Sequence, residues 1–382
     1  MKRILIKNAR LVLENEVLED GAVMVKNGVI SGYGRNGDIP TPPYAETVDA
    51  ENNLLGPGFI DIHTHLCTGN IFLDDPQSVL NDLAKHGVTG MLPTIPYGLS
   101  TDETEKLIVN LLNLGDPLFR KMFLGIHMEG PYLNPKYGAE SWRMRKPERA
   151  EYLKYMELAG DMIKIWVVAP EIEGTAELVK EIAKRGIVLS IGHSEAEASR
   201  VLDLIPRGLR LACHTMCATG VSPKPSRYGG TREAGVDEVV MLRDEIYAEV
   251  IADSAGAHIR PLMLQLLYKV KGADRIILIT DVGSILAVSS QKTDTDILFT
   301  AKGELAGTAL TMNRTVGNMI KHAGISYSDA FKMASLNPAR LLGLDKEIGS
   351  IAAGKKANLV IVDDAINVQR IMIEGTSYPA GR

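Results

Sequence analysis

Histidine and acidic residues recur in this chain at the ends of short apolar runs, at spacings that suit metal chemistry. Imidazole nitrogens and carboxylate oxygens in this mixture are typical ligands of Zn²⁺ and of similar divalent metals. We therefore expect these side chains to share a metal site, although a single one of them is more often an ordinary polar residue under a loop. The residues concerned are His63, His65, Glu129, His193, His214 and Asp281.

The pair His63 and His65 carries the clearest geometric signal. Two residues apart on a strand, the imidazoles point the same way with Cα atoms about 6.6 Å apart, so that one ion can join them. His127 stands in the same relation to Glu129, and we expect it either to bind the metal or to orient a ligand. Asp281 is expected to be a metal ligand or a proton shuttle, with the N-cap of a helix as its alternative role.

These residues can converge only if the apolar runs lie side by side. Eight such runs alternate with helical stretches such as 175–186, which is the pattern of parallel βα units. We therefore expect a (β/α)8 TIM-type barrel, whose site lies at the C-terminal strand ends, with an open doubly wound sheet as the alternative. The predicted strands are 59–65, 87–95, 123–130, 163–170, 188–194, 210–216, 248–254 and 276–282.

The two ends of the chain are β-rich and are predicted to form a second unit. The head holds short apolar runs and the dipeptide Asn27-Gly28, which is a strong hairpin signal. The tail has similar runs, and neither end is large enough to bury a core alone. We expect residues 1–56 and 346–382 to form one small β-sandwich subdomain beside a catalytic barrel at 57–345.

Composition limits the function classes. The chain has 382 residues, of which 45% are hydrophobic and 23% charged, which excludes a disordered protein. Its formal charge of −5 leaves no basic stripe for nucleic acid or an anionic membrane. Three cysteines give no disulfide framework, and the N-terminus has no apolar run long enough for a signal peptide. We expect a cytoplasmic protein with a small-molecule substrate and without nucleic acid or membrane partners.

Three competing motifs are set aside. GYGRNG at 32–37 matches a dinucleotide fingerprint, but the proline-rich stretch after it cannot start the required helix. Lys164 begins its predicted strand, at the wrong end of a barrel to bridge metals. Cys217 is interpreted as a packed thiol rather than a nucleophile.

Longer motifs resemble those of the amidohydrolase superfamily, and within it the N-acetylglucosamine-6-phosphate deacetylases. The motifs are PGFIDIHTH, GIHMEGPYLNP, SIGHSEA, ITD, GELAGTALTMNR and NPARLLGLDKEIGSIAAGKKANLVIVD, so the likeness spans nearly the whole chain. It implies a metal-dependent barrel with a split β-sandwich, commonly a homodimer. It also implies one or two divalent ions per subunit, with Zn²⁺ as the first candidate.

The resemblance also assigns metal ligands. Glu129, His193 and His214 resemble the core ligands of the family, with Glu129 in place of the bridging lysine of other amidohydrolases. His63 and His65 resemble the ligands of a second metal. Their presence favours two ions.

Further residues are assigned to the substrate side of the site. Arg232 resembles a residue that contacts substrate phosphate, and His258 resembles one that reaches the phosphate across a dimer. The chain departs from the family at Cys217, where an asparagine is usual, and at Glu140, where a histidine or glutamine is usual. A negative charge at Glu140 suits a phosphorylated substrate poorly. Ala218, next to Cys217, is counted with these substrate residues.

The expected reaction is removal of an N-acetyl group from an amino sugar, with N-acetylglucosamine 6-phosphate giving glucosamine 6-phosphate and acetate. A divalent metal lowers the pKa of a bound water from about 15.7 to about 7, so no serine nucleophile is needed. Asp281, which resembles the family's catalytic aspartate, is expected to take the water proton and return it to the leaving amine. The alternatives are another N-acyl or cyclic amide, such as an unphosphorylated N-acetyl sugar or an N-acyl amino acid, and a non-catalytic scaffold that binds partners.

Overall fold

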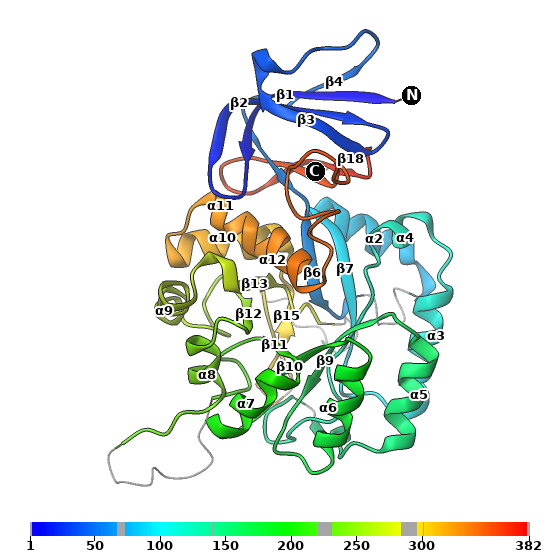
Figure 1. The fold of residues 1–382 in the computed structure, drawn as a ribbon, viewed down its shortest axis with the longest axis vertical. Coiled ribbons are helices and arrows are strands. Elements are labelled where there is room, and N and C mark those ends of the chain that lie inside the picture. Colours follow the sequence, from blue (N-terminus) through cyan, green and yellow to red (C-terminus); the bar gives the residue numbers. More distant parts are fainter. Residues whose placement is uncertain are drawn as a thin grey trace.

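In the computed structural model the chain forms a barrel with a smaller sheet stacked on one end of it (Figure 1). The structure describes residues 2–66, 73–139, 141–220, 231–283, 296–300 and 302–379. The barrel strands run from β6 to β13, and the sheet collects strands from both ends of the chain. The fold class predicted from the sequence is therefore confirmed, and the open doubly wound sheet is excluded.

Eight parallel strands lie in chain order around the barrel. The first and last of them meet at their C-terminal ends, where Asp281 N–H donates to His63 O and His65 N–H donates to Val282 O, both at 3.0 Å. These bonds close the sheet and place the ends of β6 and β13 side by side. The strands are β6 (Phe59–Thr64), β7 (Val88–Ile95), β8 (Ile126–Met128), β9 (Ile163–Val168), β10 (Val188–Ile191), β11 (Leu209–Ala212), β12 (Tyr247–Ile251) and β13 (Ile276–Ile279).

The barrel strands are apolar along most of their length because both of their faces are covered. Every residue of β6, β7 and β13 is buried. Such continuous burial is typical of parallel strands with helices on one face and the barrel interior on the other. A polar side chain in one of these strands is therefore an exception that needs a partner.

Helices cover the outside of the barrel (Figure 1). Helix α3 shows how they are set: Ser100 and Glu103 form a capping box at its start, and Leu107, Ile108 and Leu111 form its buried face. The helices are α2 (Pro76–Lys85), α3 (Thr101–Asn113), α4 (Pro117–Met122), α5 (Arg149–Ala159), α6 (Thr175–Lys184), α7 (Ala198–Leu204), α8 (Val236–Leu242), α9 (Pro261–Lys271), α10 (Met312–Ala323), α11 (Tyr327–Phe331) and α12 (Asn337–Leu341), with a π-helical turn, η7 (Lys332–Leu336), between the last two.

The second sheet joins the head and tail of the chain through antiparallel pairing of β5 with β16. Asn27 and Gly28 both have positive φ, of 51° and 82°, as the tight hairpin turn between β2 and β3 requires. Ile4, Ile30 and Ile361 belong to its own apolar core. Its strands are β1 (Arg3–Val12), β2 (Val17–Lys26), β3 (Val29–Arg35), β4 (Glu46–Asp49), β5 (Leu54–Pro57), β16 (Leu359–Val362), β17 (Val368–Ile373) and β18 (Thr376–Pro379).

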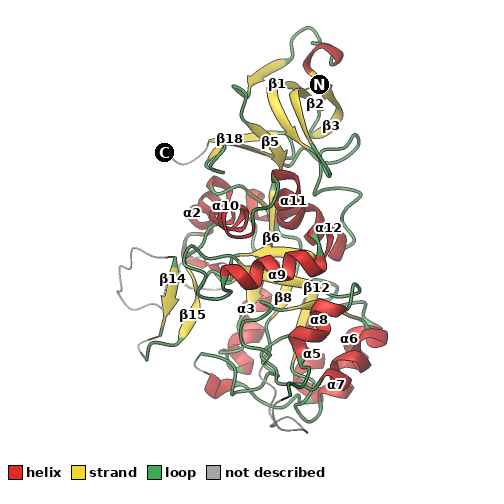
Figure 2. Ribbon diagram, turned by 90° about the vertical axis from the view of Figure 1, so that its left-hand side faces the viewer, coloured by secondary structure: helices red, strands yellow, loops and turns green. Residues whose placement is uncertain are grey.

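A separate hairpin, β14 (Ile297–Phe299) and β15 (Leu305–Thr308), projects from the side of the barrel (Figure 2). It is attached at its base, because Thr308 N–H donates to Asp281 O and Gly283 N–H donates to Thr308 O, both at 3.0 Å. The hairpin thus extends from the end of the last barrel strand.

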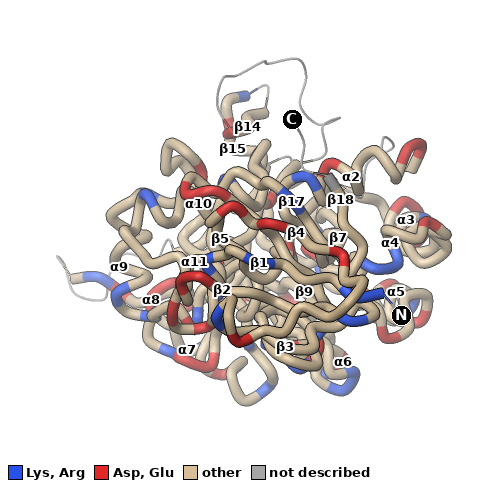
Figure 3. Tube along the Cα trace, turned by 90° about the horizontal axis from the view of Figure 1, so that it is seen from above, with Lys and Arg blue, Asp and Glu red and all other residues tan. Residues whose placement is uncertain are grey.

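Acidic and basic residues are interspersed along the face shown in Figure 3. Within the described residues, no helix combines the length and the apolar character that a membrane crossing demands.

Glu151, on α5, anchors the long loop between β8 and α5. Its carboxylate accepts hydrogen bonds from Thr101 Oγ1 at 2.6 Å, Tyr155 Oη at 2.7 Å and Tyr132 Oη at 2.8 Å. Arg145 forms an ion pair with the same carboxylate. Because Tyr132 and Arg145 belong to the loop, Glu151 ties it to the outer helices.

We expect Glu151→Gln to destabilise the protein at neutral pH. Burial raises the pKa of Glu151, but hydrogen bonds from Arg145, Thr101 and Tyr155 outweigh burial and lower the pKa from 4.5 to about 2. The carboxylate therefore stabilises the fold fully above pH 4.5, and this stabilisation is lost as the pH falls toward about 2. In urea unfolding, the difference between variant and wild type should shrink through that window.

The matched control is Glu157→Gln, which changes an exposed residue of the same helix. Its unfolding midpoint should follow that of the wild type at every pH. A Glu151→Gln variant as stable as the wild type at neutral pH would contradict the anchoring role.

Candidate metal centre

Three of the predicted ligands meet at the C-terminal ends of β8, β10 and β11. Glu129 Oε1 lies 3.0 Å from His193 Nε2 and 3.3 Å from His214 Nε2. The two Nε2 atoms are themselves 3.0 Å apart. We call Glu129, His193 and His214 the first donor group. All three side chains are buried, so their donor atoms are aimed at one another rather than at solvent.

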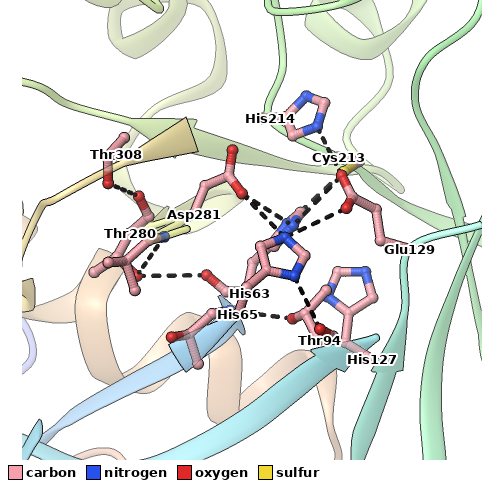
Figure 4. A network of polar contacts seen from close by, with 12 residues as sticks. His63, His65, Thr94, His127, Glu129, Cys213, His214, Thr280, Asp281 and Thr308 are labelled. Carbon is pink, nitrogen blue, oxygen red and sulfur yellow. Dashed lines mark hydrogen bonds and ion pairs between the residues drawn. The ribbon is translucent and has the colours of Figure 1, made fainter. Parts of the chain in front are cut away.

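A second donor group, of His63, His65 and Asp281, forms where the first and last barrel strands meet (Figure 4). Asp281 Oδ1 lies 3.5 Å from His63 Nε2 and 3.4 Å from His65 Nε2. The second oxygen of Glu129, Oε2, is 3.3 Å from His65 Nε2. Glu129 therefore stands between the two groups, with one oxygen toward each.

The backbone turns sharply at three of these residues. His193, His214 and Asp281 have φ of 47°, 23° and 47°, in the left-handed region that residues with a Cβ rarely adopt. Such conformations cost about 1–3 kcal/mol each and persist where the surrounding structure fixes them, often at functional sites. The strained turns lie where the strands end, at the residues that carry the donor atoms.

The imidazole rings are held from behind through Nδ1. In three of them the partner is a backbone carbonyl, so Nδ1 carries the proton and Nε2 faces the other donors. A histidine that binds a metal through Nε2 is typically oriented in this way. The bonds run from His65 to Thr94 O (2.9 Å), from His193 to Tyr137 O, and from His214 to Cys217 O (3.0 Å).

The acidic groups raise the pKa values of the rings around them. Burial lowers the pKa of His65 and His214, but hydrogen bonds and charges from Glu129 and Asp281 outweigh burial and raise the pKa to about 10 and about 9. Burial raises the pKa of Glu129, yet its hydrogen bonds with histidines hold the pKa well below the ordinary value. In Asp281, His63 and His65 outweigh burial and lower the pKa to about 2. Both carboxylates therefore stay charged and require positive charge close by.

The donor set fits a divalent metal. Tetrahedral bonds of about 2.0–2.1 Å place neighbouring ligand atoms roughly 3.3 Å apart, and the atoms of the first donor group are 3.0–3.3 Å apart. Nitrogen lone pairs and a carboxylate at such distances repel one another unless a proton or a cation lies among them. Imidazole and carboxylate together suit Zn²⁺ or a similar ion.

His127 lies behind the second donor group. Its ring centroid is 4.7 Å from that of His63, and its Nδ1 donates to Ile62 O at 2.8 Å. Burial, together with the nearby His63, lowers the pKa of His127 to about 4, so the ring is neutral. Of the two roles predicted for His127, this geometry favours orientation of His63 over metal binding.

A cavity of about 560 Å³ opens over both donor groups. Cys217, Ala218 and His258 line it, together with Lys136 and Trp142 from the loop after β8. Burial raises the pKa of the Cys217 thiol to about 12, so the thiol stays protonated, as a packed cysteine rather than a nucleophile. A cavity of this size holds a sugar-sized ligand.

Arg232 lies in a neighbouring cavity of about 570 Å³ rather than over the donor groups. Its side chain is 88% exposed and pairs with Glu238 at 3.0 Å. His258 lines both cavities; its Nδ1 is 3.0 Å from Asp253 Oδ2, and its Nε2 has no hydrogen-bond partner among the described residues. His258 is thus a buried residue that borders both cavities. Glu140 lies outside the described residues.

Two buried carboxylates near the site are not among the residues singled out from the sequence. Glu249, in the middle of β12, accepts a hydrogen bond from His63 Nδ1 at 3.2 Å. Asp61, on β6, accepts from the Thr280 hydroxyl at 2.6 Å and from the His63 N–H at 3.2 Å. In both cases the available signal was an acidic residue inside an apolar strand, because a buried carboxylate is costly without a partner.

Known proteins resemble the chain over nearly its whole length. Residues 54–377 match the amidohydrolase family. An N-acetylglucosamine-6-phosphate deacetylase of Bacillus subtilis is 32% identical over 96% of this chain and 94% of its own. An N-acetylgalactosamine-6-phosphate deacetylase of Escherichia coli O157:H7 is 31% identical over 97% of this chain and 98% of its own. The crystal structure of N-acetylglucosamine-6-phosphate deacetylase from Pasteurella multocida has a TM-score of 0.83 and 27% identity, and covers 99% of this chain and 100% of that one.

We expect the first donor group to bind a divalent ion tightly enough to stabilise the fold. Addition of Zn²⁺ to metal-free protein should raise the midpoint of thermal unfolding, because an ion at about 1,000 times its Kd contributes about 4 kcal/mol. Glu129→Gln replaces the carboxylate that both groups share and should remove most of this rise. The measurement is differential scanning calorimetry with and without the ion.

His86→Ala, a change at the end of α2, serves as the control and should keep the full rise. An equal rise in Glu129→Gln and in the wild type would place the stabilising ion elsewhere.

Proposed function

The chain belongs to the amidohydrolase family, and from this premise we propose that it is a metal-dependent deacetylase of an N-acetylhexosamine 6-phosphate, with N-acetylglucosamine 6-phosphate as the first candidate. It is a hydrolase of amide C–N bonds. The observation that carries the proposal is the convergence of the first donor group with Asp281 beneath one cavity. The relatives that share the fold and most of the chain length support it.

The residues of the two donor groups have different roles in the proposed reaction, which are metal binding and proton transfer. A divalent ion bound there would polarise the acyl carbonyl and make water a stronger nucleophile. Glu129, His193 and His214 would hold that ion, and their buried positions keep the donor atoms in place without solvent. The rings of His193 and His214 are already oriented by backbone carbonyls, so binding of the ion needs little rearrangement of these side chains.

Asp281 would act as the general base and then as the general acid of the reaction. Its Oδ1 faces the imidazoles of His63 and His65, and Asp281 also lines the cavity. The carboxylate accepts a proton from the attacking water as the C–O bond forms, and it returns this proton to the nitrogen as the C–N bond breaks. Acetate and a free amine are the products, with no other reactant than water.

The substrate side supports a sugar phosphate through charge and shape. Lys136 brings a positive charge to the cavity, His258 borders it, and Trp142 adds an aromatic side chain that is 73% exposed. His258 also lines the neighbouring cavity of Arg232, so a phosphate at the junction of the cavities could contact His258. Zinc as the ion and a homodimer as the assembly belong to the proposal.

A second candidate is an N-acetylhexosamine without phosphate. Arg232, the arginine expected to meet the phosphate, lies outside the cavity of the donor groups and pairs with Glu238. Glu304, by contrast, brings an acidic group into that cavity. These two observations are the grounds for the second candidate, which the substrate panel distinguishes from the first.

The proposed substrate is tested by a panel. Acetate release should be fastest with the 6-phosphates of N-acetylglucosamine and N-acetylgalactosamine, which differ in configuration at one carbon. The unphosphorylated sugars should have kcat/KM at least about tenfold lower, because they offer no anionic group to Lys136. N-acyl amino acids should also be at least about tenfold slower, because they lack the sugar ring. Equal or higher kcat/KM with an unphosphorylated sugar would favour the second candidate.

Asp281→Asn tests the proton transfer. Loss of a general acid/base typically lowers kcat by about 10² to 10⁴, and we expect a loss in this range with the best substrate of the panel. Metal content is measured on the same sample by elemental analysis, so that loss of the ion is told apart from loss of the carboxylate.

Asp161→Asn, at an exposed position before β9, is the control and should keep the wild-type kcat. An Asp281→Asn variant that retains both the ion and a kcat within about twofold of the wild type would exclude this role for the carboxylate.

A further inference from the structure

Glu249 is the third residue of β12, and it is fully buried. Its neighbours Ala248 and Val250 belong to the apolar core. Within the described part of the chain its ion-pair partner is a histidine, His63, rather than a lysine or an arginine. A carboxylate in such surroundings is costly, so its contacts are expected to matter for the site.

One oxygen of Glu249 contacts both donor groups. Oε2 accepts a hydrogen bond from His63 Nδ1 at 3.2 Å and another from the backbone N–H of His214, also at 3.2 Å. His63 lies on β6 and belongs to the second donor group, whereas His214 follows β11 and belongs to the first. The contact with His63 is to the ring, and the contact with His214 is to the main chain.

The ring of His63 is therefore held differently from the other imidazoles. In His65, His193 and His214, Nδ1 contacts a backbone carbonyl, whereas in His63 it contacts the side-chain carboxylate of Glu249. A carboxylate behind a histidine fixes its tautomer and makes the opposite nitrogen a stronger metal ligand. In His63 that nitrogen is Nε2, which lies 3.5 Å from Asp281 Oδ1 and has no hydrogen-bond partner among the described residues.

We propose that Glu249 is a positioning residue that fixes His63 Nε2 toward the second donor group, so that a second divalent ion binds there only with Glu249 in place. The inference rests on the proposed function, which needs an ion in the first donor group. It adds that binding of an ion to the second donor group depends on Glu249. The first group has its own supports, because His193 and His214 are oriented by the carbonyls of Tyr137 and Cys217.

The test is a metal titration of the full chain. Metal-free wild-type protein is titrated with Zn²⁺ in a calorimeter and should take up two ions. Glu249→Gln keeps the side-chain size and removes the charge, and should weaken the second ion about 10- to 100-fold, the usual effect of losing such an orienting group. Glu249→Ala should lose the second ion, while the first ion binds both variants within about threefold of the wild type.

Asp253→Asn is the matched control, because Asp253 is a buried carboxylate just after the same strand and contacts His258 instead of a donor group. It should bind both ions as the wild type does. Far-UV circular dichroism confirms that each variant is folded, and retention of the first ion confirms it independently.

Wild-type affinity for both ions in folded Glu249→Gln and Glu249→Ala would overturn the inference. Loss of both ions together would also overturn it, because Glu249 would then support the whole centre. A third ion that binds the wild type but not the Glu249 variants would also overturn the inference, because Glu249 would then be a metal ligand. Its fellow ligands would be His63 and Cys213, since the ligand atoms of the three residues lie within 4.8 Å of one another. A wild type that binds one ion overturns the inference and leaves the proposed hydrolase, whereas a wild type that binds none overturns the proposed function itself.

Discussion

The arrangement of the candidate metal centre depends on the free-energy cost of burying negatively charged carboxylates. Glu129 and Asp281 lie at the C-terminal ends of the barrel strands and Glu249 lies within β12, and among the described residues each is paired with histidines rather than with lysine or arginine. Histidine can release its proton near neutral pH and bind a metal through the freed nitrogen, which lysine and arginine at their ordinary pKa values do not do. The arrangement lowers the pKa of Glu129 and of Asp281, so that both stay charged, and a metal ion can replace the protons that neutralise them.

Closure of the barrel is what brings these groups together. Main-chain hydrogen bonds join the ends of β6 and β13, and Thr280 adds a side-chain bond to Asp61 across the same seam. Thr308, at the base of the projecting hairpin, donates to Thr280 O at 2.7 Å. The second donor group lies directly on this seam, so its geometry depends on two strands that are far apart in the sequence.

The sequence predicts the barrel and the grouping of its strand ends because both depend on regular patterns. Eight apolar runs separated by helices have few folds open to them, and polar residues at strand ends fall on one rim. The sequence does not predict a role for Glu249, because the residue lies within a strand and its partner depends on how the strands are aligned across the barrel. Arg232 and His258 lie on loops, whose paths depend on tertiary contacts that no spacing reveals. For the division of the metal ligands between two sites and for the substrate contacts, the resemblance to a family supplied what patterns alone did not.

The pairing of β5 with β16 has a consequence for biosynthesis. Leu359 is opposite Pro57, so roughly 300 residues separate the partners along the chain. At about 5–20 residues per second, a ribosome needs roughly 15–60 s to make that interval. During this interval the edge of β5 that later pairs with β16 has no partner strand, and the small sheet is completed only after the barrel has been synthesised.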